Sequence, residues 1–213
     1  MFVQKFTNVK KIKMISYICD NMEDRKLTAA EMGRISPEEY RNRPGSGIAV
    51  ILDNVRSAYN VGSAFRSADA FGADLVVLCG ICATPPSAEI HKTALGAEEA
   101  VPWRHYADTL DAVAALKAEG YTVVSVEQTE NSVKLSAAGV IPPSAASLRE
   151  APPFAAGQTK YAFIFGNEVE GVQQSVVNAS DFCLEIPQHG TKHSLNVSVT
   201  VGIVLFATCK ATV

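Results

Sequence analysis

Three short segments of this sequence place glycine or hydroxyl groups beside charged or amide side chains, and apolar runs precede them. They are Asn60–Arg66, Gly166–Gly171 and Ser194–Ser198. Apolar runs that end in such residues are typical of strands followed by tight loops or helix starts. Ligands of parallel sheets bind beyond the carboxyl ends of the strands. The three segments are therefore the first candidates for a functional site.

The first segment combines Asn60, Gly62 and Arg66, and Arg56 and Tyr59 lie just before it. Arginine suits bidentate binding of phosphate, so Arg66 is a candidate phosphate clamp. With Arg56 it could form a nucleic-acid patch in which Tyr59 stacks on a base. A helix cap at Asn60 and a surface arginine would fit the same pattern.

The second segment holds two glycines five residues apart, Gly166 and Gly171, with Glu168 and Glu170 between them. Glycines at this spacing fit a tight loop whose backbone amides face a ligand. The loop lacks the lysine and hydroxyl residue of a Walker loop. Its carboxylates would repel phosphate and suit a neutral or cationic ligand, although an acidic surface turn would look the same.

The third segment begins with Ser194, which is placed to cap a helix that runs to the end of the chain. Asn196 lies in an otherwise apolar helix, so its amide must find hydrogen-bond partners. His189 and His193 are four residues apart in a predicted loop, and no third ligand stands near them. The pattern therefore predicts no metal site.

Apolar runs and helical patterns alternate along the chain, which predicts an α/β fold with a mainly parallel sheet flanked by helices. A long, partly irregular connection is predicted over 129–158, and a loop or short helix over Pro85–Gly96. The predicted strands are Ile48–Leu52, Leu75–Leu78, Thr122–Val126, Tyr161–Phe165 and Phe182–Ile186, and the predicted helices are Val61–Phe71, Asp108–Ala118 and Ser194 to the end.

Bulk composition fits one domain with a short extension. The 213 residues are 47% apolar and carry a net charge of −3. Five cysteines without regular spacing indicate a reducing compartment. The pair Cys79 and Cys82 forms a CxxC, but the following residues suggest a loop and no second pair exists for zinc. No apolar run is long enough for a signal or membrane segment, which predicts a cytoplasmic protein without a membrane partner.

The N-terminal part is basic and distinct from the rest. Residues 1–43 hold nine Lys/Arg against six Asp/Glu, and the remainder holds ten against sixteen. Thr28 begins a capping-box pattern, and Ser36 with Pro37 resembles a second helix start with proline at the first helical position. We therefore predict a basic helical extension over 1–46 and one domain over 47–213. The basic extension is either a phosphate contact or a solvated leader.

Taken together, the three segments match one signature. The patterns N-x-G-x-x-x-R, G-x-E-x-x-G and I-P-x-x-G…S-L-N-V-S occur in this order over about residues 48–209. This set resembles the SpoU (TrmH-type) RNA 2′-O-methyltransferases of the SPOUT superfamily. The resemblance covers essentially the whole chain beyond the extension.

The resemblance implies a fold, a cofactor and a reaction. It implies an α/β domain whose C-terminal part forms a deep trefoil knot, and a homodimer with the site near the interface. The cofactor would be S-adenosyl-L-methionine, and the substrate a ribose 2′-hydroxyl of tRNA or rRNA. Cofactor contacts would carry over to Gly166, Asn167, Ile186, Gln188 and Leu195.

The resemblance also implies active-site roles for Asn60, Arg66, Glu168, Ser194 and Asn196. Arg66 would approach the RNA phosphate and ribose and assist deprotonation, although a protonated arginine is a very weak base. Asn60 and Glu168 would orient Arg66. Ser194 and Asn196 would support the cofactor loop.

Two departures and two rival interpretations accompany the resemblance. Many relatives have methionine where Gln188 stands and alanine where Thr200 stands. The RNA-binding segments of some relatives have no counterpart here, which leaves the target RNA open. A Rossmann enzyme is disfavoured because no glycine precedes Gly62 after the first strand. A catalytically silent RNA-binding module on the same fold is the other alternative.

Overall fold

The computed structural model of the chain describes residues 25–28, 30–136, 139–141 and 160–208. It divides into two units, one ending at Ile35 and one beginning at Ser36. In the first unit Thr28 and Glu31 exchange the hydrogen bonds of a capping box, N to Oε2 at 2.8 Å and N to Oγ1 at 3.4 Å. A turn follows at Ala30–Gly33 in place of a helix.

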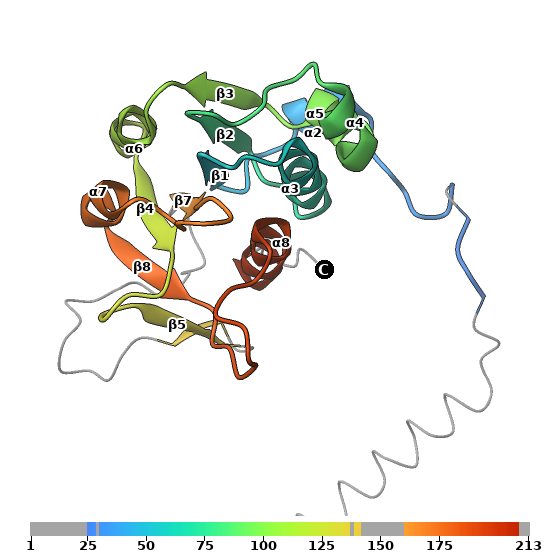
Figure 1. Cartoon of the computed structure of the whole chain (residues 1–213). Coiled ribbons are helices and arrows are strands. Elements are labelled where there is room, and N and C mark those ends of the chain that lie inside the picture. Colours follow the sequence, from blue (N-terminus) through green and yellow to red (C-terminus); the bar gives the residue numbers. More distant parts are fainter. Residues whose placement is uncertain (1–24, 29, 137–138, 142–159, 209–213) are drawn as a thin grey trace, which may run out of the picture. The chain divides into compact units, whose positions relative to one another are not determined.

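The second unit is built on a mixed sheet of eight described strands (Figure 1). Their order across the sheet is β3-β2-β1-β7-β4-β8-β5-β6. All run parallel except β6, which pairs antiparallel with β5. The strands are β1 Ile48–Asp53, β2 Leu75–Cys79, β3 Trp103–Tyr106, β4 Tyr121–Val126, β5 Val133–Ser136, β6 Gly139–Ile141, β7 Lys160–Phe165 and β8 Phe182–Glu185.

The parallel α/β architecture and the five predicted strands are confirmed, with ends that shift by one residue. Three strands were not predicted. Strand β3 is a mostly exposed edge strand without an apolar run. Strands β5 and β6 lie inside 129–158, where the sequence predicted a long and partly irregular connection without naming these strands. Residues 137–138 and 142–159 of this connection lie outside the described residues.

Helices cover both faces of the sheet, because successive side chains of a strand point to opposite sides. In β1, Val50 and Leu52 belong to the core under α3 and α8, whereas Ala49 and Ile51 pack toward α6 and α7 (Figure 1). Strands buried on both faces give continuous apolar runs, as observed. The helices are α2 Pro37–Asn42, α3 Ala58–Ala70, α4 Ala88–Ala94, α5 Ala97–Ala100, α6 Thr109–Ala118, α7 Gln174–Ala179 and α8 Val197–Thr208.

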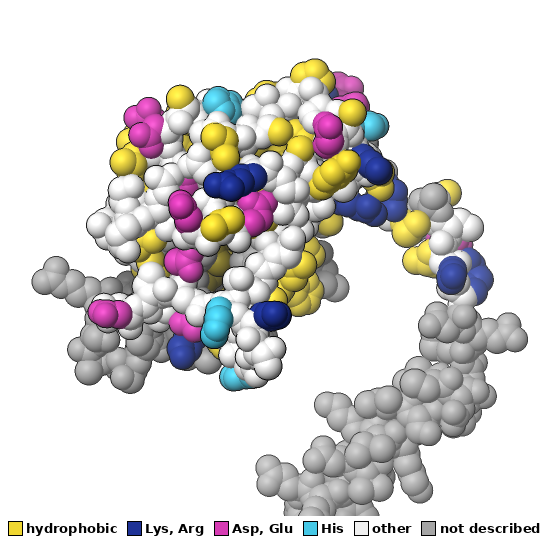
Figure 2. Space-filling model, in the orientation of Figure 1, with side chains coloured by type: hydrophobic (Ala, Val, Ile, Leu, Met, Phe, Trp, Pro, Cys, Tyr) yellow, Lys and Arg dark blue, Asp and Glu magenta, His cyan; other side chains and the backbone are white. Residues whose placement is uncertain are grey.

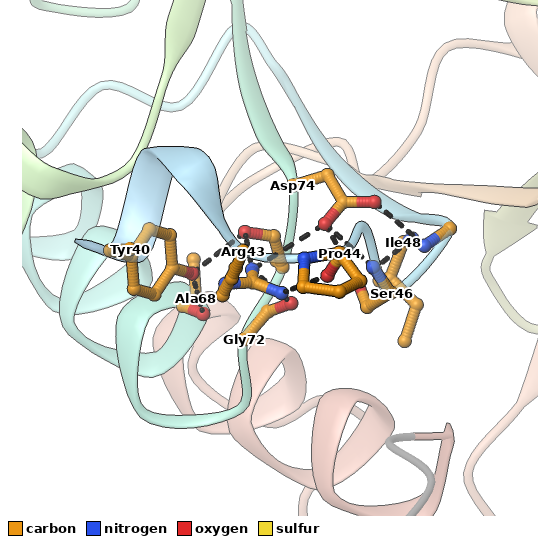
Figure 3. A network of polar contacts seen from close by, with 10 residues as sticks. Tyr40, Arg43, Pro44, Ser46, Ile48, Ala68, Gly72 and Asp74 are labelled. Carbon is orange, nitrogen blue, oxygen red and sulfur yellow. Dashed lines mark hydrogen bonds and ion pairs between the residues drawn. The ribbon is translucent and has the colours of Figure 1, made fainter. Parts of the chain in front are cut away.

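Helix α2 packs onto the sheet domain through a polar network (Figure 3). Ser36 caps it in a capping box with Glu39, and Pro37 is its first residue, as predicted. The buried Tyr40 hydroxyl lies 2.7 Å from the Ala73 carbonyl oxygen, and burial raises the pKa of Tyr40 to about 12. The guanidinium of Arg43 lies 4.3 Å from the Tyr40 ring centroid. Residues 36–46, assigned to the extension by sequence, are thus part of the second unit.

The CxxC pair is structural. Cys79 and Cys82 are buried free thiols. Burial raises the pKa of Cys79 to about 12 and that of Cys82 to about 11. The Cys82 sulfur accepts a hydrogen bond from the Val55 N–H at 3.1 Å, which holds the loop after β1. Thiols with raised pKa are poor nucleophiles, so the pair lacks the chemistry of a redox motif.

None of the described helices is both long and apolar enough to cross a membrane.

Candidate functional site

The three candidate segments meet at one edge of the sheet. Strands β1 and β7 are parallel neighbours, with Leu52 paired to Phe165, so the loops that follow both strands leave the same edge. The first loop leads into α3 and the second is the Gly166–Gly171 segment. Strand β8, two places along, sends the chain through 186–196 to α8. Parallel pairing therefore brings together segments that are more than 100 residues apart in sequence.

Asn60, Glu168 and Asn196 form a hydrogen-bonded junction between these segments. Asn60 Nδ2 donates to Glu168 Oε1 at 2.8 Å, and Asn196 Nδ2 donates to Asn60 Oδ1 at 3.2 Å. Glu168 also accepts the backbone N–H groups of Arg56 at 3.2 Å and Ser57 at 3.3 Å. Each candidate segment contributes one side chain to the junction, as the sequence predicted them to share a site.

The Glu168 carboxylate is stabilised in its ionised form. Burial alone would raise its pKa, but hydrogen bonds from the Asn60 amide and from the backbone N–H groups of Arg56 and Ser57 outweigh that effect. The pKa of Glu168 consequently lies below its usual value. The junction therefore holds a negative charge at neutral pH.

The Gly166–Gly171 loop folds back on itself. Asn167 and Gly171 exchange backbone hydrogen bonds of 3.1 and 3.2 Å. The Asn167 side-chain oxygen accepts the N–H groups of Val169 at 2.8 Å and Glu170 at 2.7 Å. At Gly166 a Cβ would overlap the carbonyl carbon of Gly171. Only glycine fits there, because the two ends of the loop touch.

Carboxylates hold the far end of the loop. The Val172 N–H donates to Glu127 Oε2 at 3.0 Å, and the Gln173 N–H donates to Asp53 Oδ2 at 3.1 Å. Asp53 is fully buried at the end of β1. Asp53 ends β1 and Glu127 follows β4, the two strands on either side of β7, so the loop is fixed to the rigid core.

A cavity of about 360 Å³ opens beside this loop. The five predicted cofactor residues all line it: Gly166, Asn167, Ile186, Gln188 and Leu195. Glu168 and Ser194 line it as well, and its remaining carboxylates are Glu127, Glu170 and Glu185. We call this hollow the acidic pocket. Its four carboxylates favour a cationic or neutral ligand and disfavour an anion.

Comparison with known proteins agrees with this arrangement. The model of the SpoU rRNA Methylase family matches residues 47–206. This chain belongs to the SpoU family.

Individual relatives share part of their length with the SpoU chain. A 23S rRNA (guanosine-2′-O-)-methyltransferase, RlmB, of Nitrosomonas europaea is 32% identical over 76% of this chain and 55% of its own length. The crystal structure of an AdoMet-bound rRNA methyltransferase from Sinorhizobium meliloti is 26% identical, with a TM-score of 0.63 over 82% of this chain and 60% of that one. The TrmH/SpoU tRNA modifying enzyme of A. aeolicus, 23% identical, has the same fold with a TM-score of 0.62 over 81% of this chain and 78% of that one. The SpoU chain spans a little over half of the RlmB relative.

The last helix of the SpoU chain begins later than predicted. Helix α8 starts at Val197, so Ser194 does not cap it. Asn196 is the cap instead, because its side-chain oxygen accepts the Ser198 N–H at 2.8 Å and its carbonyl accepts the Thr200 N–H at 3.0 Å. Capping and the bond to Asn60 together satisfy the Asn196 amide. Ser194 remains in the exposed segment that lines the acidic pocket.

Arg66 lies apart from the junction in the SpoU chain. It stands on α3, six residues beyond Asn60, and it is exposed. No hydrogen bond joins Arg66 to Asn60 or Glu168 among the described residues, and the role of these two residues in orienting Arg66 stays a prediction. Arg66 lines a second hollow, of about 500 Å³, between α3, α4 and α8.

The predicted nucleic-acid patch is only partly assembled. Tyr59 is 46% exposed, and the ammonium of Lys92 lies 5.7 Å from its ring centroid. Arg56 is exposed but does not line the hollow that contains Arg66. Lys92, on α4, does line that hollow and was missed by sequence analysis.

Other residues missed by sequence analysis include Glu127 and Gln128, which line the acidic pocket. They directly follow β4, a strand that was predicted, so the rule that ligands bind at carboxyl ends of strands could have found them. Gln128 Nε2 donates to the His193 carbonyl at 2.9 Å, which holds the segment before α8. Nothing in the sequence marks Lys92 in this way.

His189 and His193, which the sequence predicts not to bind a metal, are both exposed, and His193 lines the acidic pocket. Among the described residues, the side chains that lie close enough together to hold a metal ion are elsewhere, at His91, Glu98 and Glu99 on α4 and α5. None of these three lines the acidic pocket. A metal-free site stays a prediction.

Proposed function

We propose that this chain transfers the methyl group of S-adenosylmethionine to a ribose 2′-hydroxyl of tRNA or rRNA. One observation carries the proposal. The Asn60–Glu168–Asn196 junction joins a pocket suited to the methyl donor with the helix that bears Arg66. Family membership and the names of the relatives support the same activity.

The acidic pocket fits S-adenosylmethionine in charge and construction. The cofactor supplies an electrophilic methyl group on a sulfonium cation, which carboxylates such as Glu168 and Glu185 favour electrostatically. The glycine at 166 lets the two ends of the loop touch, which gives the loop its shape beside the pocket. Gly166, Ile186 and Leu195 would hold the cofactor largely through backbone groups, and Asn167 and Gln188 would complete the wall.

The residues around the pocket can prepare the hydroxyl. Methyl transfer is an in-line displacement, so positioning supplies much of the rate. Arg66 would hold a phosphate beside the target ribose and stabilise the developing oxyanion. This role suits arginine better than direct proton removal, because a guanidinium cannot be deprotonated in proteins. Asn60, Glu168 and Asn196 would keep α3 at a fixed distance from the pocket, with Ser194 in the pocket wall.

The sheet order supports a C-terminal trefoil knot. Strand β7 inserts between β1 and β4 after the chain has already passed through β5 and β6. The segment from β8 to α8 then lies beside the loop that follows β7, because residues of both line the acidic pocket. We propose that this return forms the knot of the SPOUT superfamily.

An exposed apolar stripe on α8 supports a homodimer. Ile203 and Phe206, beyond the part of α8 that lines the hollow with Arg66, lie on one face of the helix and are 36% and 72% exposed. A stripe of this kind on an otherwise polar surface is typical of a protein interface. Light scattering is expected to give the mass of a dimer, and Ile203→Asp to lower it to that of a monomer.

Two experiments test the proposed reaction. Calorimetry should show binding of S-adenosylmethionine, and a protein that binds RNA but no cofactor would be a silent RNA-binding module. Deletion of the gene should remove one 2′-O-methyl mark from tRNA or rRNA, and the lost mark names the target. Unchanged methylation of both RNA classes would contradict the proposal.

We also propose a cytoplasmic location, which the free thiols of Cys79, Cys82 and Cys183 support.

A further inference from the structure

The hollow between α3, α4 and α8 differs in charge from the rest of the domain. Its polar lining consists of two cations and four hydroxyl side chains, and no carboxylate of the described part of the chain lines it. We call it the basic groove. Figure 2 shows dark blue side chains gathered on the side where α3 and α4 lie, whereas magenta side chains recur across the middle of the same face. The polar lining residues are Ser63, Arg66, Ser67, Lys92, Thr93 and Ser198.

The hydroxyl groups of the groove are largely committed to the protein. Ser63 and Thr93 each donate to the Tyr59 carbonyl oxygen at 2.9 Å. Ser198 donates to Asn196 Oδ1 at 2.6 Å. Their hydrogens therefore point away from the groove. The donors that remain for an anion in the groove are Arg66, Lys92 and the Ser67 hydroxyl, and the two cations supply its charge.

Helix packing fixes the position of Lys92. Helix α4 lies against α3 at Gly62, where a Cβ would overlap Thr93 Oγ1 and the Ile90 carbonyl oxygen. Gly62 and Ile90 are buried, so this contact belongs to the core. The bond from Thr93 to Tyr59 closes the same contact. Lys92, the neighbour of Thr93, is thus presented by a rigid element and needs no rearrangement to face the groove.

The basic groove and the acidic pocket adjoin each other across the start of α8. Val197 and Thr200 line the pocket, and Ser198 and Val199 line the groove. Asn60 of the junction lies on the same helix as Arg66. A chain of phosphates bound in the groove therefore passes beside the place where the methyl donor would lie.

We propose that Lys92, with Arg66, binds the phosphate backbone of the RNA substrate in the basic groove next to the target ribose. This inference rests on the proposed function. It assigns to α4 a part in RNA binding. The exposed ring of Tyr59 lies at 5.7 Å from the Lys92 ammonium and holds it at the side of the groove through a cation–π contact.

The test compares Lys92→Ala with a matched lysine. Lys160 on β7 lies 5.2 Å from the Tyr121 ring, which reproduces the Lys92–Tyr59 contact at the opposite end of the strands. Lys160→Ala therefore removes the same charge and the same kind of contact. The probe is a labelled single-stranded RNA of random sequence, and its affinity is measured over a range of salt concentrations.

Loss of one phosphate contact should change both the affinity for RNA and the dependence of that affinity on salt. Lys92→Ala should weaken RNA binding roughly tenfold, as expected for a charged hydrogen bond. It should also reduce the slope of log affinity against log salt by about 0.7, the value for one contact to a single strand. Lys92→Arg should restore both quantities, and Lys160→Ala should resemble the wild type.

These measurements distinguish failure of this inference from failure of the proposed function. If Lys92→Ala keeps the wild-type slope while methylation proceeds, the groove does not bind RNA and the reaction stands. If the wild type binds no S-adenosylmethionine but Lys92→Ala loses the slope, the groove binds RNA and the proposed reaction is wrong. A lower molecular mass of Lys92→Ala in light scattering would show instead that the groove contacts a second copy of the chain, which would overturn the inference.

Discussion

The acidic pocket and the basic groove lie on either side of the first turn of α8, yet they are built differently. The pocket is made by loops at the carboxyl ends of β4, β7 and β8, and tight backbone contacts shape it. The groove is made by three packed helices, and its charge comes from two long side chains. The pocket should therefore be sensitive to changes that move the backbone, and the groove to changes of charge.

The largest effect is expected at Gly166, where the pocket depends on the backbone. In Gly166→Ala the new methyl group overlaps Gly171, so the loop must open. Overpacking of this kind costs about 1–3 kcal/mol. Because the pocket is shaped by the closed loop, this corresponds to roughly a fivefold to 150-fold loss of affinity for S-adenosylmethionine in calorimetry. Gly190→Ala is the control, since no atom lies within 4 Å of its Cβ position. Equal affinities in both variants would show that the loop does not shape the pocket.

The next effect is expected at Glu168, where the pocket meets α3. Glu168→Gln keeps the shape but turns an amide donor toward the N–H groups that the carboxylate accepts. Hydrogen bonds to charged groups contribute about 1.5–3 kcal/mol, so methyl transfer to RNA should fall roughly tenfold to hundredfold. Glu170→Gln removes a carboxylate from the same pocket without touching the junction, and it should keep most of the activity. A similar loss in both variants would mean that only the total charge matters.

The pH dependence of stability tests whether Glu168 acts through the hydrogen bonds of its ionised carboxylate or only through the shape of its side chain. Because the folded pKa of Glu168 lies below its usual value, its ionised form stabilises the fold at neutral pH. That contribution is fully present above about pH 4.3, the usual pKa of glutamate, and is lost as the pH falls through the lower folded pKa. The stability difference between wild type and Glu168→Gln should therefore shrink in acid. A constant difference from pH 7 to pH 3 would contradict the hydrogen-bond account.

A smaller effect is expected at Asn196, which caps α8 and bonds to Asn60. Asn196→Ala should cost about 0.5–2 kcal/mol of stability, the usual loss for a helix cap. Asn196→Asp keeps the cap but has no amide to donate to Asn60 Oδ1, so it should retain stability and lose activity up to roughly tenfold. Thermal melting and methylation assays measure the two quantities. Asp108→Ala, which removes the cap of α6, should lower stability alone.

The sequence predicted the site well where local pattern determines structure. Continuous apolar runs identify buried parallel strands, and parallel strands end at one edge. Asn60 and Glu168 could therefore be placed together although 108 residues separate them. The start of α8 was misplaced because Ser194 and Asn196 are both good caps. Which of them caps depends on the contact of Asn196 with Asn60, and that contact is not local.

The basic groove could not be predicted for the same reason. Its cations come from α3 and α4, and Lys92 lies in a short helix without a distinctive pattern. Periodicity shows which face of an element is buried, but it does not show which element covers it. The insertion of β7 between β1 and β4 likewise follows from long-range pairing. Strand β3 was missed because an exposed edge strand lacks an apolar run.

The smallest effect is expected at the two departures from the family pattern, both of which line the acidic pocket. The half-buried Gln188 amide has no hydrogen-bond partner among the described residues. A cofactor that covers this amide must remove its water, and Gln188→Met removes that desolvation cost of about 1 kcal/mol. Affinity for S-adenosylmethionine should rise roughly fivefold in calorimetry. Thr200→Ala should leave it unchanged, because the Thr200 hydroxyl already donates to the Asn196 carbonyl at 3.1 Å. A fall in affinity in Gln188→Met would show that this amide binds the cofactor directly, so that one side chain of the pocket matters as much as its backbone.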